Sequence, residues 1–261
     1  MSINYERRGT GAPLVLFHGI GHRWQAWQPV LDELAHHHDV YAVDLPGFGR
    51  SAVPDGGMPA DMAGAVAGVL AALADLGVER PHVAGNSLGG AISLELAAAG
   101  LAASATALSP AGFFTRAEAR RALAILSLLR ASTRGPAPVL RQALRRGFVR
   151  KLTFGTLMTQ PGRLDLDRLV GDAIALRDGA GFRAVARSAN RYAFQGRPSV
   201  PVTVAWGTRD RILRPRQADR ARERLPDARH VALPGCGHVP MSDAPDLVAR
   251  LILQTTGAVP T

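Results

Sequence analysis

The feature that most constrains the fold is a regular alternation between short apolar runs and longer segments with helical spacing. The apolar runs have strand length and lie at residues 13–17, 39–43, 81–85, 104–108, 201–206 and 228–233. The segments with helical spacing lie between and after them, at residues 23–36, 60–76, 88–99, 214–225 and 243–255. Such alternation is typical of a mostly parallel sheet covered by helices on both faces. The sequence therefore predicts an α/β protein.

One long stretch interrupts this alternation. Residues 111–198 follow a predicted strand but contain no clear strand of their own, only amphipathic segments punctuated by Gly and Pro. We therefore expect a helical cap (lid) at 111–198, inserted into one core domain made of residues 1–110 and 199–261. The insertion holds 17 of the 31 basic residues but five acidic ones, so it carries a charge of +12 and the remainder about −2.

The net charge of +10 would ordinarily indicate nucleic acid, an anionic membrane or an acidic substrate as partner. Lys151 is the sole lysine, however, and the richness in Arg, Ala and Gly indicates a compositional bias. No nucleic-acid recognition module accompanies the charge, so we favour a solvated basic surface and rank nucleic-acid binding through the basic cap last among the alternatives. Neither a membrane-spanning run nor a signal peptide is visible, which favours a cytoplasmic protein. Cys236 is the single cysteine, which excludes an internal disulfide and disfavours a cysteine-based metal site.

The clearest chemical signal surrounds Ser87. It lies in Gly-Asn-Ser-Leu-Gly-Gly at residues 85–90, directly after a predicted strand and directly before a predicted helix. A serine on so sharp a turn needs small neighbours, and Gly85 and Gly89 provide the room. In this context the motif indicates a nucleophilic serine, whereas a Gly-Ser-Gly pattern alone more often marks an ordinary turn.

A serine nucleophile needs a base, and eight histidines compete for that role. His238 follows the last predicted strand in a Gly-rich loop, which can present an imidazole over the carboxyl edge of the sheet. His22 lies in a loop near the presumed site and could touch substrate, although an exposed loop histidine is the commoner case. The others end a helix or lie within strands, and we expect them to be structural: His36, His37, His38, His82 and His230.

The imidazole needs a carboxylate to hold its tautomer. Asp210 follows the predicted strand at 201–206 and gives the chain order Ser, Asp, His, although a turn-capping aspartate is its alternative interpretation. Asp44 also ends a strand, but it precedes the serine and opens what we interpret as a structural turn. At the end of the strand near 108, where another acid might stand, the sequence has Ser109.

Acyl transfer also needs two N–H donors for the tetrahedral oxyanion. Leu88, directly after the nucleophile, provides one. The second should come from the loop after the strand at 13–17, where we favour Ile20 over Gly19 and interpret His18 as a structural support.

Taken together, these motifs resemble the α/β-hydrolase superfamily. They are His18-Gly19, Asp44 to Ser51, Gly85 to Gly90, Trp206 to Asp210 and Gly237 to Pro240, in the family's order. The resemblance implies the α/β-hydrolase fold and a cofactor-free enzyme with its site beneath the cap. The serine at position 87 departs from the aspartate nucleophile of haloalkane dehalogenases and epoxide hydrolases, which disfavours those activities. The chain is more similar to compact esterases, lipases, perhydrolases and ring-cleavage-product hydrolases.

The sequence thus predicts a serine hydrolase that cleaves a carboxylic ester, or a similar acyl bond, of a small organic molecule. Carbon-carbon bond hydrolysis, lactone opening and perhydrolysis on the same three residues are alternatives, as is a low-turnover ligand-binding or sensor protein. Two sets of arginines in the cap could each line one helix face and attract a carboxylate or phosphate, although a solvated helix face is the commoner explanation. The first set is Arg141, Arg145 and Arg146, and the second is Arg183, Arg187 and Arg191.

Overall fold

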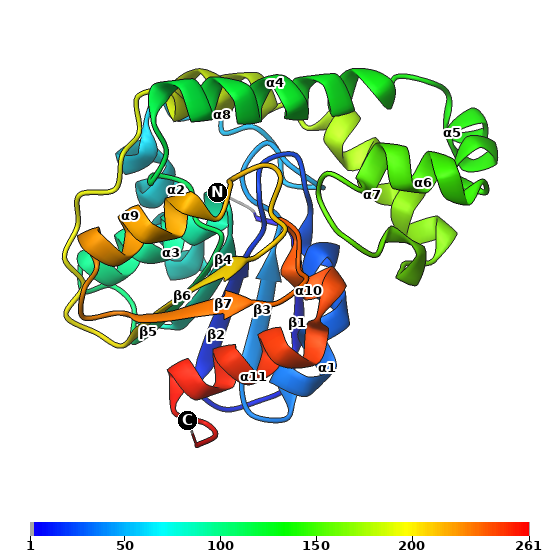
Figure 1. Cartoon of the computed structure of the whole chain (residues 1–261). Helices are drawn as coiled ribbons and strands as arrows, with labels where there is room; N and C mark the ends of the chain where they lie inside the picture. Colours follow the sequence, from blue (N-terminus) through cyan, green and yellow to red (C-terminus); the bar gives the residue numbers. More distant parts are fainter. Residues whose placement is uncertain (1–2, 261) are drawn as a thin grey trace.

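The computed structural model describes residues 3–260, and within them one seven-stranded sheet forms the centre of the molecule (Figure 1). Its strand order is β1-β3-β2-β4-β5-β6-β7, and every neighbouring pair is parallel except β1 with β3. The strands are β1 (Tyr5–Arg8), β2 (Pro13–Phe17), β3 (Asp39–Val43), β4 (His82–Asn86), β5 (Ser104–Leu108), β6 (Val202–Gly207) and β7 (Arg229–Leu233). The α/β-hydrolase fold predicted from the sequence is confirmed.

The inner strands are mainly apolar because both faces of the sheet are buried. In β2, Val15 and Phe17 join the core on one face, whereas Leu14 and Leu16 join the core on the other. This alternation is the two-residue period of an extended chain. The first face is covered by α2 (Met62–Asp75), α3 (Leu88–Ala98) and α9 (Arg216–Arg224), and the second by α1 (Gln28–Ala35) and α11 (Pro245–Thr256).

Two predicted elements differ in detail from the structure. The segment 23–36 is divided into a 3₁₀ turn, η1 (Trp24–Trp27), and α1, because Pro29 has no N–H to donate and fits the first turn of a helix. The segment 243–255 likewise becomes the short α10 (Pro240–Asp243) followed by α11. The sequence analysis missed β1, whose residues Tyr-Glu-Arg-Arg are partly or fully exposed at this edge of the sheet and form no apolar run.

The chain between β5 and β6 forms an insertion of helices above the carboxyl ends of the strands (Figure 1). We call it the α4–α8 insertion. Its helices are α4 (Arg116–Ser132), α5 (Ala137–Leu144), α6 (Gly147–Phe154), η2 (Pro161–Arg163), α7 (Leu166–Asp178) and α8 (Phe182–Ala189). Helices α5 to α7 enclose a small apolar cluster of their own, centred on Leu144, Phe154 and Leu169, while α4, α7 and α8 also pack against the main core.

Candidate active site

Ser87 lies on the sharp turn between β4 and α3, with φ 56° and ψ −111°. Non-glycine residues rarely adopt this backbone conformation, and it persists only where the surroundings enforce it. A Cβ at Gly85 would overlap the Gly89 carbonyl, and a Cβ at Gly89 would overlap the Phe17 carbonyl. The glycines that the sequence analysis singled out are therefore required for close backbone approach. They let the turn pack directly on the end of β2.

Asp210 and His238 lie together beyond the ends of β6 and β7. His238 Nδ1 is 2.7 Å from Asp210 Oδ2, and both side chains are at least 95% buried. The other carboxylate oxygen, Oδ1, accepts hydrogen bonds from the backbone N–H groups of Ile212 and Leu213, at 2.8 and 2.9 Å. These two bonds fix the plane of the carboxylate. Asp210 can therefore hold His238 with the proton on Nδ1 and leave Nε2 free to act as a base.

Asn86, directly before Ser87, connects the histidine loop to the serine turn. Its Nδ2 donates to the backbone carbonyl of His238 at 2.8 Å and to that of Leu108 at 3.1 Å. The structure thus brings the main chain at position 238 against the residue next to the predicted nucleophile. Within residues 3–260, no hydrogen bond within 3.5 Å yet joins Ser87 Oγ to His238. In unliganded enzymes such bonds are often long and shorten when substrate binds.

Ile20 and Leu88, whose backbone N–H groups are the predicted oxyanion donors, both lie next to Ser87. Leu88 is the first residue of α3, and Ile20 lies in the loop after β2; both line one pocket with Ser87. Neither backbone N–H donates a hydrogen bond elsewhere in the part of the chain that the structure describes. A Cβ on Gly19 would lie 3.3 Å from Ser87 Cβ, so this loop passes very close to the serine.

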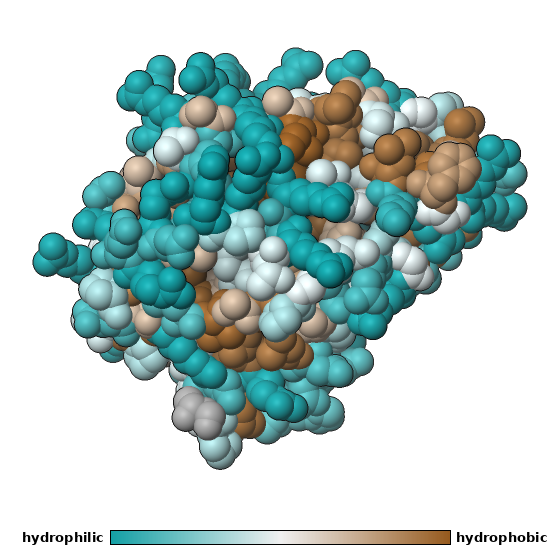
Figure 2. Space-filling model, in the orientation of Figure 1, coloured by the Kyte–Doolittle hydropathy of each residue, from teal (hydrophilic) through white to brown (hydrophobic). Residues whose placement is uncertain are grey.

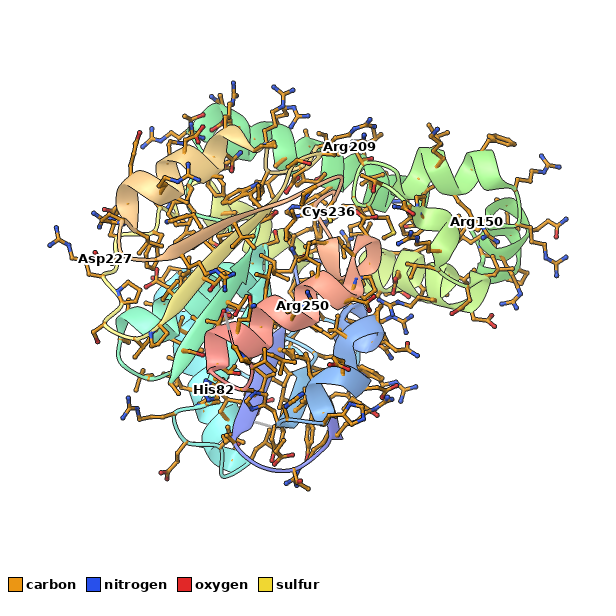
Figure 3. The ribbon with its side chains drawn as sticks, turned by 60° about the horizontal axis from the view of Figure 1, so that its bottom comes forward. His82, Arg150, Arg209, Asp227, Cys236 and Arg250 are labelled. Carbon is orange, nitrogen blue, oxygen red and sulfur yellow. The ribbon has the colours of Figure 1, made fainter. Side chains whose placement is uncertain are left out.

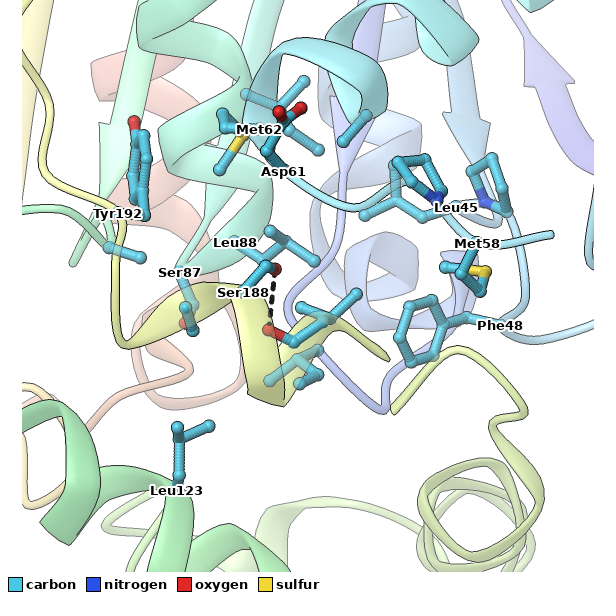
Figure 4. A pocket seen from close by; sticks show the side chains of 18 of the residues that line it. Leu45, Phe48, Met58, Asp61, Met62, Ser87, Leu88, Leu123, Ser188 and Tyr192 are labelled. Atoms are coloured by element: carbon cyan, nitrogen blue, oxygen red, sulfur yellow. Dashed lines mark hydrogen bonds between the residues drawn. The ribbon is translucent and has the colours of Figure 1, made fainter. Parts of the chain in front are cut away.

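The pocket beside Ser87 is narrow and almost wholly apolar, with a volume of about 110 Å³. Figure 4 shows Leu123 approaching from α4, Phe48 and Met58 from the loop before α2, and Tyr192 from the chain after α8. Asp61 is the one charged residue in the lining, and its carboxylate accepts the N–H of Gly64 at the start of α2. No arginine contributes to the lining. The pocket therefore suits an uncharged, apolar group.

A second and larger groove, of about 1280 Å³, runs between α2 and α8 on the outside of this pocket. It shares part of the pocket wall, including Met58, Met62, Ser188 and Tyr192. Its outer lining includes Arg187 and Arg191 from the second arginine set. The apolar pocket and this groove are therefore neighbours that share these side chains.

Comparison with known proteins agrees with this architecture. A family model described as "Alpha/beta hydrolase family" matches residues 14–251. The chain belongs to the alpha/beta hydrolase family. The pimeloyl-[acyl-carrier protein] methyl ester esterase of Aeromonas salmonicida is 38% identical over 100 residues, which are 37% of this chain and 36% of that protein. The matches span about a quarter to a third of the length of the first curated relatives.

Solved structures of this fold superpose over nearly the whole chain. A thermophilic esterase from Thermogutta terrifontis has a TM-score of 0.76 at 21% identity and covers 99% of this chain and 94% of its own. A meta-cleavage product hydrolase has a TM-score of 0.77 at 17% identity, and the match covers 98% of this chain and 95% of that chain. At such identities the likeness establishes the fold alone. The reaction and substrate class of this member of the family must therefore be argued from its own site.

His18 and Asp44 support the loops of this α/β hydrolase rather than its chemistry. The His18 ring donates from Nδ1 to the Gly19 carbonyl, at 2.7 Å, and accepts the Leu45 N–H at Nε2, at 2.9 Å. Burial lowers the pKa of His18, so the ring is neutral and both nitrogens are engaged. Asp44 accepts the backbone N–H groups of Trp24 and Arg50, at 2.6 and 2.8 Å. The structural roles expected for both residues agree with these contacts.

His22 belongs to a buried ionic cluster that joins the loop after β2 to α7. Asp172 accepts hydrogen bonds from Arg23 Nε at 3.1 Å and from Arg168 Nε at 2.8 Å, and its side chain is 4% exposed. His22 Nε2 lies 3.9 Å from the same carboxylate, and its Nδ1 accepts the Arg23 N–H. Burial lowers the pKa of His22 to about 4. The possible substrate contact of His22 finds no support, since this histidine does not line the pocket.

The sequence analysis missed Asp243, a buried carboxylate that fastens the histidine loop. Asp243 accepts backbone N–H groups from Gly237 at 2.7 Å, from Thr159 at 2.9 Å and from Gln160 at 2.9 Å. Gly237 precedes the predicted base, whereas Thr159 and Gln160 belong to the α4–α8 insertion. We call this arrangement the Asp243 clamp. An aspartate at the end of a four-residue helix gives no sequence signal for such partners.

The remaining candidate groups lie apart from this chemistry. Burial raises the pKa of the Cys236 thiol to about 11, which leaves it unreactive near neutral pH. His82 begins β4, at the opposite end of the sheet from the Cys236 loop (Figure 3). Ser109 has φ 43° and a buried Oγ without a hydrogen-bond partner.

Within residues 3–260, no cluster of three His, Cys, Asp or Glu side chains is suited to a metal ion, and no helix could cross a membrane.

Proposed function

We propose that this α/β hydrolase cleaves a carboxylic ester with a short apolar acyl group, through an acyl-enzyme on Ser87. One observation carries the proposal. The Asp210–His238 pair is attached, through Asn86, to the strained turn that holds Ser87 at the wall of an apolar pocket. This arrangement joins a base, its orienting carboxylate and a nucleophile, which are the parts that acyl transfer needs.

In the proposed reaction, Ser87 Oγ attacks the ester carbonyl while His238 Nε2 takes its proton. Asp210 keeps the other imidazole proton on Nδ1 and stabilises the imidazolium that forms. The imidazolium then gives its proton to the leaving alcohol as the carbon-oxygen bond breaks. Water, deprotonated by the same imidazole, attacks the acyl-enzyme and releases the carboxylic acid, which restores the Ser87 hydroxyl.

The N–H groups of Ile20 and Leu88 would stabilise the oxyanion of both tetrahedral intermediates. Their position beside Ser87 and their lack of other hydrogen-bond partners within residues 3–260 support this role. Removing one donor of this kind costs about 3 kcal/mol of transition-state stabilisation in a well-studied hydrolase. Leu88 also begins α3, whose N-terminal dipole favours negative charge at this point.

The pocket sets the size and polarity of the acyl group. Apolar cavities of about 150 Å³ accommodate a benzene-sized ligand. The pocket here, at about 110 Å³, would therefore take an acyl chain of roughly four to six carbons. No basic residue in the lining could neutralise a carboxylate or a phosphate on that chain. The resemblance to the Aeromonas salmonicida methyl ester esterase supports ester chemistry as well.

Fluorophosphonate labelling with mass-spectrometric mapping tests the nucleophile. We expect the label on Ser87, with no labelling in Ser87→Ala and little in His238→Ala. Ser188→Ala, which removes another pocket serine, is the matched control and should label normally. Hydrolysis of p-nitrophenyl esters should peak at four to six carbons. A folded protein that resists the label and hydrolyses no ester would overturn the proposal in favour of a ligand-binding or sensor protein.

The same three residues could also hydrolyse a carbon-carbon bond, open a lactone or form a peracid. A parallel panel with vinylogous diketones, lactones and peroxide separates these reactions from ester hydrolysis. The pocket lining contains no basic residue, which favours the neutral ester, because the carboxylate of an acidic substrate would be buried there without a partner.

A further inference from the structure

The α4–α8 insertion contains a long stretch without a single negative charge. Residues 119–164 include ten basic residues and no acidic one. This stretch covers most of α4, all of α5 and α6, and η2. The active-site pocket uses none of its basic side chains, so the proposed chemistry does not explain the charge.

The same stretch carries the most exposed large apolar side chains of the described residues. Four side chains on α4 to α6 are 59–77% exposed: Leu128, Val139, Phe148 and Leu152. The other exposed large apolar side chains are only 38–40% exposed. Figure 2 shows brown, apolar side chains gathered over this part of the molecule and bordered by teal, hydrophilic ones. Contiguous apolar surface on a protein usually marks an interaction site.

The outward residues of α6 are not needed to hold the insertion together. Phe148 and Leu152 are one helical turn apart, at 68% and 77% exposure, and therefore share the outer face of the helix. Phe154 and Leu144, at 4% and 2%, point into the small cluster that fastens α5 and α6 to α7. Folding accounts for the buried residues but leaves the exposed pair without a role.

Three of the basic side chains near Phe148 and Leu152 make no ion pair in the described part of the chain. Arg141 pairs with Asp167, and Arg150 donates to the Leu144 carbonyl. Arg145, Arg146 and Lys151, by contrast, make no ion pair within residues 3–260. We call the outer face of these two helices the α5–α6 surface. Its members are Val139, Phe148 and Leu152 together with Arg145, Arg146 and Lys151.

We propose that the α5–α6 surface binds a lipid bilayer that contains anionic headgroups. Exposed apolar side chains beside unpaired cations are the features of helices that lie in the headgroup region, where the apolar groups insert and the cations contact phosphates. The apolar side chains project outward and line no groove, which suits a deformable lipid surface better than a folded protein partner. Docking would also bring the insertion, which supplies Leu123 and Val185 to the pocket, to the membrane.

Vesicle flotation with the full chain tests the proposal. We expect the protein to float with vesicles of phosphatidylcholine and phosphatidylglycerol at low salt, and not with phosphatidylcholine alone. Phe148→Ser with Leu152→Ser should weaken this binding at least tenfold, as should the triple variant R145Q/R146Q/K151Q. Two control variants change residues elsewhere in the chain. Leu101→Ser removes an exposed apolar side chain and matches the serine variant, and R80Q/R197Q/R250Q removes three positive charges and matches the glutamine variant. Both controls should bind as the unchanged protein does.

Several results would overturn the proposal. These are absence of flotation, equal weakening by the control variants, or salt-sensitive binding to DNA as strong as to vesicles and insensitive to the Phe148 and Leu152 changes. A dimer in light scattering that the double serine variant dissociates would instead assign the surface to a second copy of the chain. Since flotation needs no turnover, its outcome is independent of the proposed esterase activity. A far-UV circular dichroism spectrum that is unchanged in every variant shows that each is folded, whatever its activity.

Discussion

Replacing Asp243 tests whether the Asp243 clamp holds the predicted base in position. The carboxylate is 4% exposed and accepts three backbone N–H groups, from Gly237, Thr159 and Gln160. In Asp243→Ala all three donors lose their partner, at about 1–3 kcal/mol each, partly offset where water enters. We expect the free energy of unfolding to fall by about 4 kcal/mol. Asp243→Asn keeps one acceptor oxygen but turns an N–H₂ toward a donor, and should cost about 2 kcal/mol.

The effect on catalysis should appear in kcat. Gly237 directly precedes His238, so loss of its hydrogen bond loosens the backbone that carries the imidazole. Displacement of a catalytic group by about 1 Å can cost roughly 100-fold in rate. For Asp243→Asn we expect kcat to fall by about 10- to 100-fold. KM for a short ester should change little, since Asp243 does not line the pocket.

Urea unfolding, with steady-state kinetics on enzyme counted by fluorophosphonate titration, measures both effects. Counting the active sites separates slow catalysis from a smaller folded fraction. Asp246→Asn is the matched control, because Asp246 is an exposed acid three residues further along the chain. The reasoning is refuted if Asp243→Asn unfolds at the same urea concentration as the unchanged protein and keeps kcat within twofold.

Three further predictions follow from other contacts. Asp210→Asn should preserve the fold but reduce kcat by roughly 10³- to 10⁴-fold, because the imidazole loses its tautomer control; a loss below tenfold would contradict the assigned role. Burial lowers the pKa of His22 to about 4, so at this position the unfolded chain binds more protons than the folded chain between pH 6.5 and 4. The contribution of His22 to stability should fall by about 3 kcal/mol as the pH drops through that interval, and His22→Asn should reduce the slope in pH-dependent urea unfolding by that amount. Leu123→Ala should enlarge the pocket and shift the preferred ester to a longer acyl chain, with each added methylene lowering the activation free energy by about 1 kcal/mol. Leu128→Ala, on the exposed face of α4, is the control and should leave the chain-length preference unchanged.

The parts of the fold that the sequence predicted correctly rest on local patterns. Strands β2 and β6 are buried on both faces and therefore read as continuous apolar runs, whereas β1 has no such run and was missed. The serine turn was equally visible, because its geometry admits only glycine at positions 85 and 89. Where a structure demands a particular residue type over a few positions, the sequence is enough to predict it.

The parts that escaped prediction depend on contacts between distant segments. Asp243 meets Thr159 and Gln160 across more than 80 residues, and Asp172 meets Arg23 across 149. Each of these aspartates looks in sequence like an ordinary polar residue of a helix. The same limit applies to His22. Its position in a loop predicted an exposed side chain, whereas in the structure α7 packs against it and buries it. The sequence alone does not show which charged or polar group of the insertion pairs with which group of the core, because the pairing depends on how the two parts pack together in the fold.

These two clusters also bear on how substrate could reach Ser87. The Asp243 clamp and the Asp172 cluster both join the α4–α8 insertion to loops of the core. Lifting the insertion as one rigid lid would break the contacts that cross between it and the core. Asp243 would lose Thr159 and Gln160, and the buried Asp172 would lose Arg23 and keep only Arg168. Helix α8 takes part in neither cluster, and the groove between it and α2 shares a wall with the pocket. Entry through this shared wall, by side-chain movement at Met58, Met62 and Tyr192, would leave both clusters intact.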